Sequence, residues 1–148
     1  MNYVYRLAFK ILILSIYFHL PASSQDMSLV VIANGKGPPP EMKLMQLKST
    51  MRGEKLRWPD GSKVVIALLK STTPIGTNTS KRIYNMSANE LNKYWLALVF
   101  QGKADAPNFF NSETELEEFV SQTSGAIGVV SHPSASNKVI LIDGQKSL

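Results

Sequence analysis

Residues 63–74 read KVVIALLKSTTP, and this stretch decides the fold class because it joins a strand signal directly to a helix signal. After Lys63 comes an apolar run rich in β-branched side chains, which is typical of a buried strand. The hydroxyl groups of residues 71–73 can cap a helix, and Pro74 is tolerated in a first helical turn. We therefore expect a strand over Lys63–Leu69 and then a helix that begins at Lys70–Pro74 and ends near Tyr84.

The residues upstream predict an earlier strand and helix. Residues 29–33 (LVVIA) form a short apolar run that is closed by Asn34 and Gly35, as expected for a buried strand. Two glycines and three consecutive prolines make residues 35–40 a loop. Apolar residues at roughly helical spacing then predict a helix from Glu41.

A tight turn separates that helix from the strand at Lys63. The helix is expected to end before Gly53, and residues 57–61 (RWPDG) carry a turn signal, since proline fixes φ and glycine accepts a positive φ. Trp58 in this turn could stack on a ligand, but an aromatic side chain here more often packs into the core. We therefore interpret Trp58 as a core residue.

Two more helices are predicted downstream. Ser87 and Glu90 form a capping box, in which each side chain accepts a hydrogen bond from the other residue's backbone amide, and Gly102 ends this helix. Asn111 or Ser112 caps the second helix, which ends at the next Ser-Gly pair. The apolar residues of both helices recur at helical spacing, and we assign them to the core: Leu91, Tyr94, Trp95, Leu98, Val99, Leu116, Phe119 and Val120.

Strands at Ala126–Val130 and Lys138–Ile142 complete the predicted elements. Because strands alternate with helices, we predict an α/β fold with a mixed, mainly parallel sheet flanked by helices. The last two strands are the exception, since they could also form a hairpin. A length of 124 residues after position 24 suits one domain, 25–148.

The N-terminal residues predict a secretory signal peptide over residues 1–24. Arg6 and Lys10 precede the apolar run Ile11–Leu20, and the small residues Ala22–Ser24 suit cleavage after Ser24. The alternative is an uncleaved membrane anchor, which would need an apolar segment of about 20 residues. We expect a periplasmic or secreted protein without a membrane span after cleavage, and the sequence has no cysteine for disulfides or a lipid anchor.

Charge and composition narrow the function classes. From Gln25 onward the chain has 14 basic and 11 acidic residues, a net charge of +3, and most of the basic residues lie in the first half of this region. This asymmetry could favour an anionic ligand, although solvated surfaces explain most such patterns. Basic runs interleaved with aromatic residues do not occur, which argues against a nucleic-acid partner.

The helix start after Leu69 is the main candidate binding site. Free amides and a partial positive charge at a helix N-terminus favour anions, which points to Lys70, Ser71, Thr72 and Thr73. The alternative is that these residues only cap the helix. Secondary candidates are Asn34 and Gly35, at the end of the first strand.

An enzyme is not expected from these residues. His132 is the only histidine after the signal segment, and Glu117 and Glu118 diverge on a helix because they are adjacent. Serine is not found in a Gly-x-Ser-x-Gly setting, and metal-ligand patterns are lacking. We therefore predict no catalytic residue, no metal site and no cofactor.

Several short motifs follow one another in an order that resembles the phosphate-binding proteins of phosphate ABC transporters, members of the type 2 periplasmic-binding-protein family. The resemblance covers about residues 29–130. It rests on Met51–Gly53, Arg57–Gly61 (RWPDG), Tyr94–Trp95, Val99–Gly102 (VFQG), Pro107 and Gly125–Val129 (GAIGV). It implies an exported solute-binding protein in which full-length members hold phosphate between two α/β lobes. This chain is the size of one lobe.

The same resemblance identifies where the sequence departs from the family pattern. The family's Arg and Ser-Gly-Thr positions fall here on Leu69 and on Thr73–Ile75, and Pro74 lacks the amide that the glycine would offer. An oxyanion at this point would use Lys70–Thr73 instead. The expected partners are phosphate or a similar small anion, an ABC permease, or a second copy that completes a cleft. The alternative is a ligand-free lobe that acts as an envelope interaction or scaffolding module.

Overall fold

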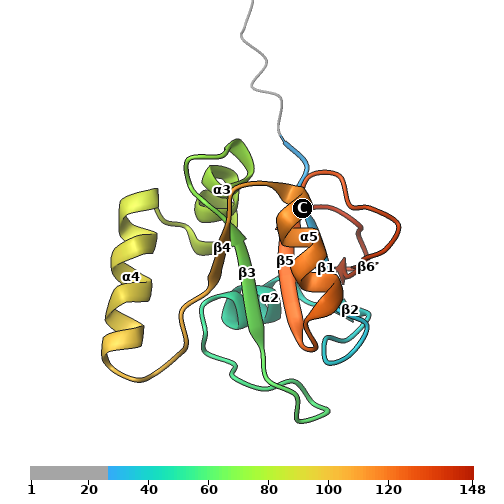
Figure 1. The fold of residues 1–148 in the computed structure, drawn as a ribbon, viewed down its shortest axis with the longest axis horizontal. Coiled ribbons are helices and arrows are strands. Elements are labelled where there is room, and N and C mark those ends of the chain that lie inside the picture. Colours follow the sequence, from blue (N-terminus) through green and yellow to red (C-terminus); the bar gives the residue numbers. More distant parts are fainter. Residues whose placement is uncertain (1–26) are drawn as a thin grey trace, which may run out of the picture.

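The computed structural model describes residues 27–148, and the predicted signal peptide lies outside the described residues. A five-stranded sheet in the order β4-β3-β5-β1-β6 forms the centre of the fold, and a two-stranded sheet joins β2 to β7 (Figure 1). The elements are β1 (Val30–Ala33), β2 (Glu41–Met42), α2 (Leu44–Met51), β3 (Val65–Leu69), α3 (Pro74–Thr79), the π-helical turn η1 (Ser80–Tyr84), α4 (Ala88–Phe100), β4 (Asn108–Phe110), α5 (Glu113–Gln122), β5 (Ala126–Val130), β6 (Lys138–Val139) and β7 (Leu141–Ile142).

The predicted α/β class with a mixed, mainly parallel sheet is confirmed. β3 runs parallel to both β4 and β5, with Ala67 opposite Asn108 on one side and Gly128 on the other. β1 is antiparallel to β5 and to β6. With the parallel β2–β7 pair included, three of the five described strand pairings are parallel, and the two antiparallel ones both involve β1.

The possible hairpin between the last two predicted strands does not form. β1 lies between β5 and β6, so the two strands are not neighbours. The predicted strand 138–142 is also divided: β6 pairs with β1, while β7 pairs with β2. The buried Ile140 at the division donates its amide to Val31, and the next amide, of Leu141, donates to Pro40. The chain therefore passes from β1 to the segment before β2 between two successive amides, and both of these backbone donors remain hydrogen-bonded.

Helices cover both faces of the sheet. Figure 1 shows α5 in front of the sheet and α2 behind it, while α4 stands apart at the β4 edge. The core is apolar on both sides, with fully or nearly fully buried side chains at Leu68, Ile127 and Leu116. Each such side chain removed from water stabilises the fold by about 1.5–3 kcal/mol.

Three local elements differ from the sequence prediction. Glu41 begins strand β2, and the helix starts later, at Leu44. The helix after Pro74 ends as α3 at Thr79 and continues as a π-helical turn to Tyr84, where Asn85 takes a positive φ of 57°. Strand β4 was not predicted, because its three residues are too short to show an alternating pattern.

Of the residues assigned to the core, Trp58 and Trp95 are buried, whereas Val99, in the last turn of α4, is 43% exposed. Trp58 is buried, and its Nε1 donates to the Gly125 carbonyl at 2.8 Å. Trp95 is buried against Tyr84 and Tyr94, with ring centroids 6.5 and 5.6 Å away in edge-on geometry. Tyr94 is half-buried and donates its hydroxyl to the Arg52 carbonyl. These contacts hold the RWPDG turn and α4 against the rest of the domain.

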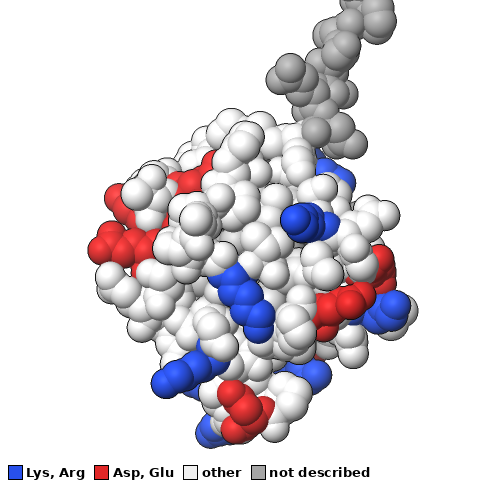
Figure 2. All heavy atoms as spheres, turned by 90° about the vertical axis from the view of Figure 1, so that its right-hand side faces the viewer, with Lys and Arg blue, Asp and Glu red and all other residues white. Residues whose placement is uncertain are grey.

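On the face that Figure 2 shows, the charged side chains are dispersed. Basic and acidic side chains form small separate groups there, with uncharged residues between them. Within residues 27–148, no helix is both long enough and apolar enough to cross a membrane.

Candidate functional site

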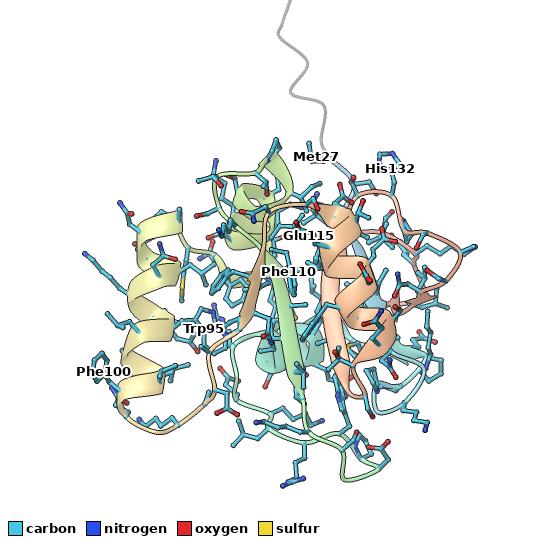
Figure 3. All side chains as sticks on the ribbon, in the orientation of Figure 1. Met27, Trp95, Phe100, Phe110, Glu115 and His132 are labelled. Atoms are coloured by element: carbon cyan, nitrogen blue, oxygen red, sulfur yellow. The ribbon has the colours of Figure 1, made fainter. Side chains whose placement is uncertain are left out.

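The carboxyl ends of three parallel strands meet at one edge of the sheet. β3 leads into Lys70, β4 leads into Asn111, and β5 leads into Ser131 and His132. Figure 3 places His132 at this edge. Loops at the carboxyl ends of parallel strands commonly hold binding sites in open α/β sheets. The main candidate residues from the sequence, Lys70–Thr73, therefore lie at the edge where a ligand site is expected.

The turn that follows β3 is held by its own hydrogen bonds. The Lys70 amide donates to the Phe110 carbonyl at 2.9 Å, which anchors the turn to β4. The Thr73 hydroxyl donates to the Lys70 carbonyl at 2.8 Å and accepts from the Gly76 amide at 3.0 Å. Thr73 is thus the N-cap of α3, and its side chain is used for structure.

Ser71 and Thr72 have donors that the fold does not use. Within the described part of the chain, neither their amides nor their hydroxyl groups donate a hydrogen bond, and only the Ser71 carbonyl is engaged, by Thr77. Lys70 is exposed beside them, and its ammonium group likewise has no described partner. This half of the candidate turn can offer two amides, two hydroxyls and one positive charge to an anion.

The secondary candidates lie at the opposite end of the sheet. Because β1 is antiparallel to β5, its last residue pairs with the beginning of β5, and Asn34 follows there. The Asn34 side-chain amide donates to the carbonyls of Val120 and Ser121 at 3.0 and 2.9 Å, which caps the C-terminal end of α5. Asn34 and Gly35 therefore cannot share one small ligand with Lys70–Thr73.

A carboxylate anchors the loop after β5, and sequence reasoning did not find it. Glu113 accepts from the Ser131 amide at 2.6 Å, from the Ser131 hydroxyl at 2.7 Å and from the His132 amide at 3.3 Å. One turn later, the buried Glu117 accepts from the Ser134 amide and the Asn137 side chain. The i, i+4 spacing of these two glutamates was the available signal.

The same cluster contains a serine, a histidine and a glutamate without the geometry of a nucleophile and base. The Ser131 hydroxyl lies 2.8 Å from His132 Nδ1, but Glu113 contacts the serine itself and not the other ring nitrogen. A catalytic base would need the carboxylate behind the imidazole to orient it. Groups of three or more metal-ligating side chains are not found within residues 27–148.

Solved structures show which known proteins share this fold. An ABC-type phosphate transport receptor from Vibrio cholerae matches with a TM-score of 0.65 and 14% identity, over 82% of this chain and 48% of the receptor. A phosphate ABC transporter substrate-binding protein from Clostridium perfringens, solved with bound phosphate, matches with a TM-score of 0.61 and 16% identity, over 81% and 46%. PstS from Borrelia burgdorferi matches with a TM-score of 0.56 and 14% identity, over 80% and 48%.

Sequence comparisons add nothing to the structural match. Neither the family models nor the curated proteins that were compared match this sequence. The chain has the fold of these phosphate-receptor structures, which confirms at the level of fold the resemblance inferred from its motifs. It spans about half the length of each of them.

Proposed function

We propose that this protein is an exported solute-binding-type domain that binds phosphate or a related oxyanion at the turn after β3. The observation that carries the proposal is a set of donors that no group within residues 27–148 engages: the Lys70 ammonium group and the amides and hydroxyls of Ser71 and Thr72. They lie at the carboxyl edge of the parallel strands. The shared fold with phosphate-receptor structures supports the same ligand class. Oxyanions are bound by amides, hydroxyls and a nearby cation of this kind.

The exposure of these residues argues for weak binding. Lys70 and Thr72 are exposed and Ser71 is half-buried, so water competes for every contact. The hydroxyl of Thr73 is already used, and Pro74 has no amide to donate. We expect a dissociation constant of about 1 mM for the isolated protein at low salt, equivalent to about −4 kcal/mol. A permease or another surface that closes over the turn would exclude water and strengthen oxyanion binding.

Calorimetric titration of the purified protein with phosphate and with sulfate at low salt tests this proposal. Lys70→Ala combined with Ser71→Ala should remove the heat of binding, whereas Lys81→Ala, an exposed lysine away from the turn, should leave it unchanged. A folded sample that gives no heat at several times the expected dissociation constant would refute oxyanion binding at this turn.

A second candidate function is assembly with another copy of the chain. α4 has two apolar faces: Trp95 points toward the sheet, whereas Phe100 points away from the domain (Figure 3). Phe100 is 83% exposed and Leu96, one turn before it, is 59% exposed. Apolar side chains at i, i+4 on a free helix face suit helix pairing. Two copies would also equal the length of one phosphate-receptor chain.

Sedimentation of the purified protein distinguishes this candidate from a monomer. We expect a dimer that Leu96→Glu with Phe100→Glu converts to monomers. Met45→Glu is the matched control, because Met45 is equally exposed but lies on α2. A monomer at high protein concentration would exclude the self-assembled form and leave oxyanion binding to be judged by titration.

A further inference from the structure

A hollow of about 430 Å³ lies at the beginning of β3, at the opposite end of this strand from Lys70. Its walls come from the loop between α2 and β3 and from the connection between α4 and β4, which both run along the lower edge of the molecule in Figure 1. The volume falls within the range of about 300–1,000 Å³ that is usual for small-molecule sites. None of the candidate residues from the sequence lines it.

The charges around the hollow are mostly positive. Lys55, Arg57, Lys63 and Lys103 line it together with one carboxylate, Asp105. Lys63 forms an ion pair with Asp105, which joins the two walls. Arg57 donates from Nη1 to the Gly61 carbonyl at 2.8 Å, so its guanidinium is held in place. Four cations therefore face a single anion.

Two of these cations are available to a ligand. Within residues 27–148, neither Lys55 nor Lys103 makes a side-chain hydrogen bond or an ion pair. They come from different segments, one after α2 and the other after α4, and both line the same hollow. An anion bound in the hollow would gain Coulomb attraction from both of these uncommitted ammonium groups.

The remaining lining is mostly apolar, with Asn108 as its one uncharged polar side chain. Leu56, Val64 and Val99 contribute to the walls, and Leu56 is 53% exposed although it is a large hydrophobic residue. Exposed apolar side chains beside uncommitted cations form an amphipathic surface. Such a surface can hold the apolar part of a ligand while the rim contacts its charge.

We propose that this hollow binds a small organic anion, in which a phosphate or carboxylate group is attached to an apolar body. The acidic group contacts Lys55 and Lys103 at the rim, and the apolar body lies against Leu56 and Val64. The site is separate from the turn at Lys70, since the two lie at opposite ends of β3. It therefore goes beyond the proposed function, and either one can fail without the other.

Titration with phenyl phosphate, followed by amide NMR of the purified protein, tests the site. We expect saturable shifts in residues 55–57, 63–66 and 103–106. Inorganic phosphate, which lacks the apolar body, and benzyl alcohol, which lacks the charge, should each bind about tenfold more weakly. Shifts confined to Lys70–Thr73, absence of saturation, or equal binding of benzyl alcohol would each overturn the proposal.

Charge variants give a second, independent readout. Lys55→Ala with Lys103→Ala should weaken phenyl phosphate binding about tenfold, while arginine at both positions should retain it. Lys81→Ala with Lys93→Ala removes the same net charge from exposed positions outside the hollow and should have little effect. Asp105→Asn removes the one carboxylate and should strengthen binding. If both double variants lose the same amount of affinity for phenyl phosphate, only the overall charge matters, and the proposed site is wrong.

Discussion

Replacing Gly76 with alanine tests whether the turn at Lys70 is held by close backbone packing. Gly76 is buried in the first turn of α3, and its amide bonds the Thr73 hydroxyl. A Cβ atom at Gly76 would collide with two backbone carbonyl groups: its nearest atom would be the Lys70 carbonyl oxygen, with that group's carbon at 2.6 Å, and the Leu69 carbonyl oxygen would lie 2.7 Å away. Both neighbours are backbone atoms at the end of β3, so neither can rotate away as a side chain would.

The expected cost follows from these distances. Ordinary contacts of a Cβ atom begin at 3.4 Å, so the start of α3 and the end of β3 must separate by roughly 1 Å. Overpacking of this kind costs about 1–3 kcal/mol, and the better helix propensity of alanine returns up to about 1 kcal/mol. We expect a net loss of about 1–2 kcal/mol in the free energy of unfolding, or about 5–10 °C in Tm for a domain of this size.

Gly35→Ala is the matched control, because a Cβ atom at this position would meet no other atom within 4 Å and the φ of Gly35 is not positive. That change should leave stability unaltered or raise it by up to about 1 kcal/mol, since alanine restricts the unfolded chain. Urea unfolding followed by the fluorescence of the buried Trp58 and Trp95 measures both variants. If Gly76→Ala is as stable as Gly35→Ala, the turn is not held by this packing and the reasoning is wrong.

Three further changes test other contacts. Asn34→Asp should lower the free energy of unfolding by about 1–3 kcal/mol, measured in urea, because it replaces the donor to the last carbonyls of α5 by a negative charge at a helix C-terminus. Unchanged stability would contradict the capping role of Asn34. Trp58→Phe should lower the free energy of unfolding by about 2–3 kcal/mol, measured by thermal unfolding, because it removes the hydrogen bond to the Gly125 carbonyl and part of a buried ring. A loss of stability no larger than that of a substitution at an exposed position would refute the core role of Trp58. Burial raises the pKa of Tyr84 above its ordinary value of about 10. As the pH rises, the unfolded state therefore loses this proton before the folded state does. The free energy of unfolding should be unaffected by Tyr84 below about pH 10 and should fall as the pH rises further. Tyr84→Phe should remove most of this decrease in stability at alkaline pH. Tyr94→Phe should remove less of it, because Tyr94 is only half-buried, although burial raises its pKa as well. An equal decrease in the unchanged protein and in both variants would show that Tyr84 is not its source.

Local patterns were sufficient for most elements of the fold. The capping box is confirmed, with the Ser87 amide 2.7 Å from Glu90 Oε2 and the Glu90 amide 3.3 Å from the Ser87 hydroxyl. Ser112 caps α5 as expected, and the RWPDG turn places Trp58 in the core. These features depend on residues a few positions apart, so their geometry is already implied by side-chain chemistry and helical spacing.

The candidate site was predicted in part. Sequence reasoning found the turn at Lys70–Thr73, because a strand that runs into hydroxyl residues and proline is a local signal. It did not separate Thr73, whose hydroxyl is used as a cap, from Ser71 and Thr72, whose donors are free within the described residues. That distinction depends on which acceptors the fold brings within reach, and Lys70 is anchored by Phe110, far along the chain.

By itself, the sequence determined the α/β class, the order of the main strands and helices, and the residues of the turn after β3. Only the tertiary structure decided that β1 runs antiparallel between β5 and β6, that Asn34 caps α5 at the far end of the sheet, and that Lys55 and Lys103 line one hollow. The physical reason is range. Helical periodicity and capping act within a few residues, whereas strand pairing and the meeting of charges from separate loops depend on long-range packing of the whole core.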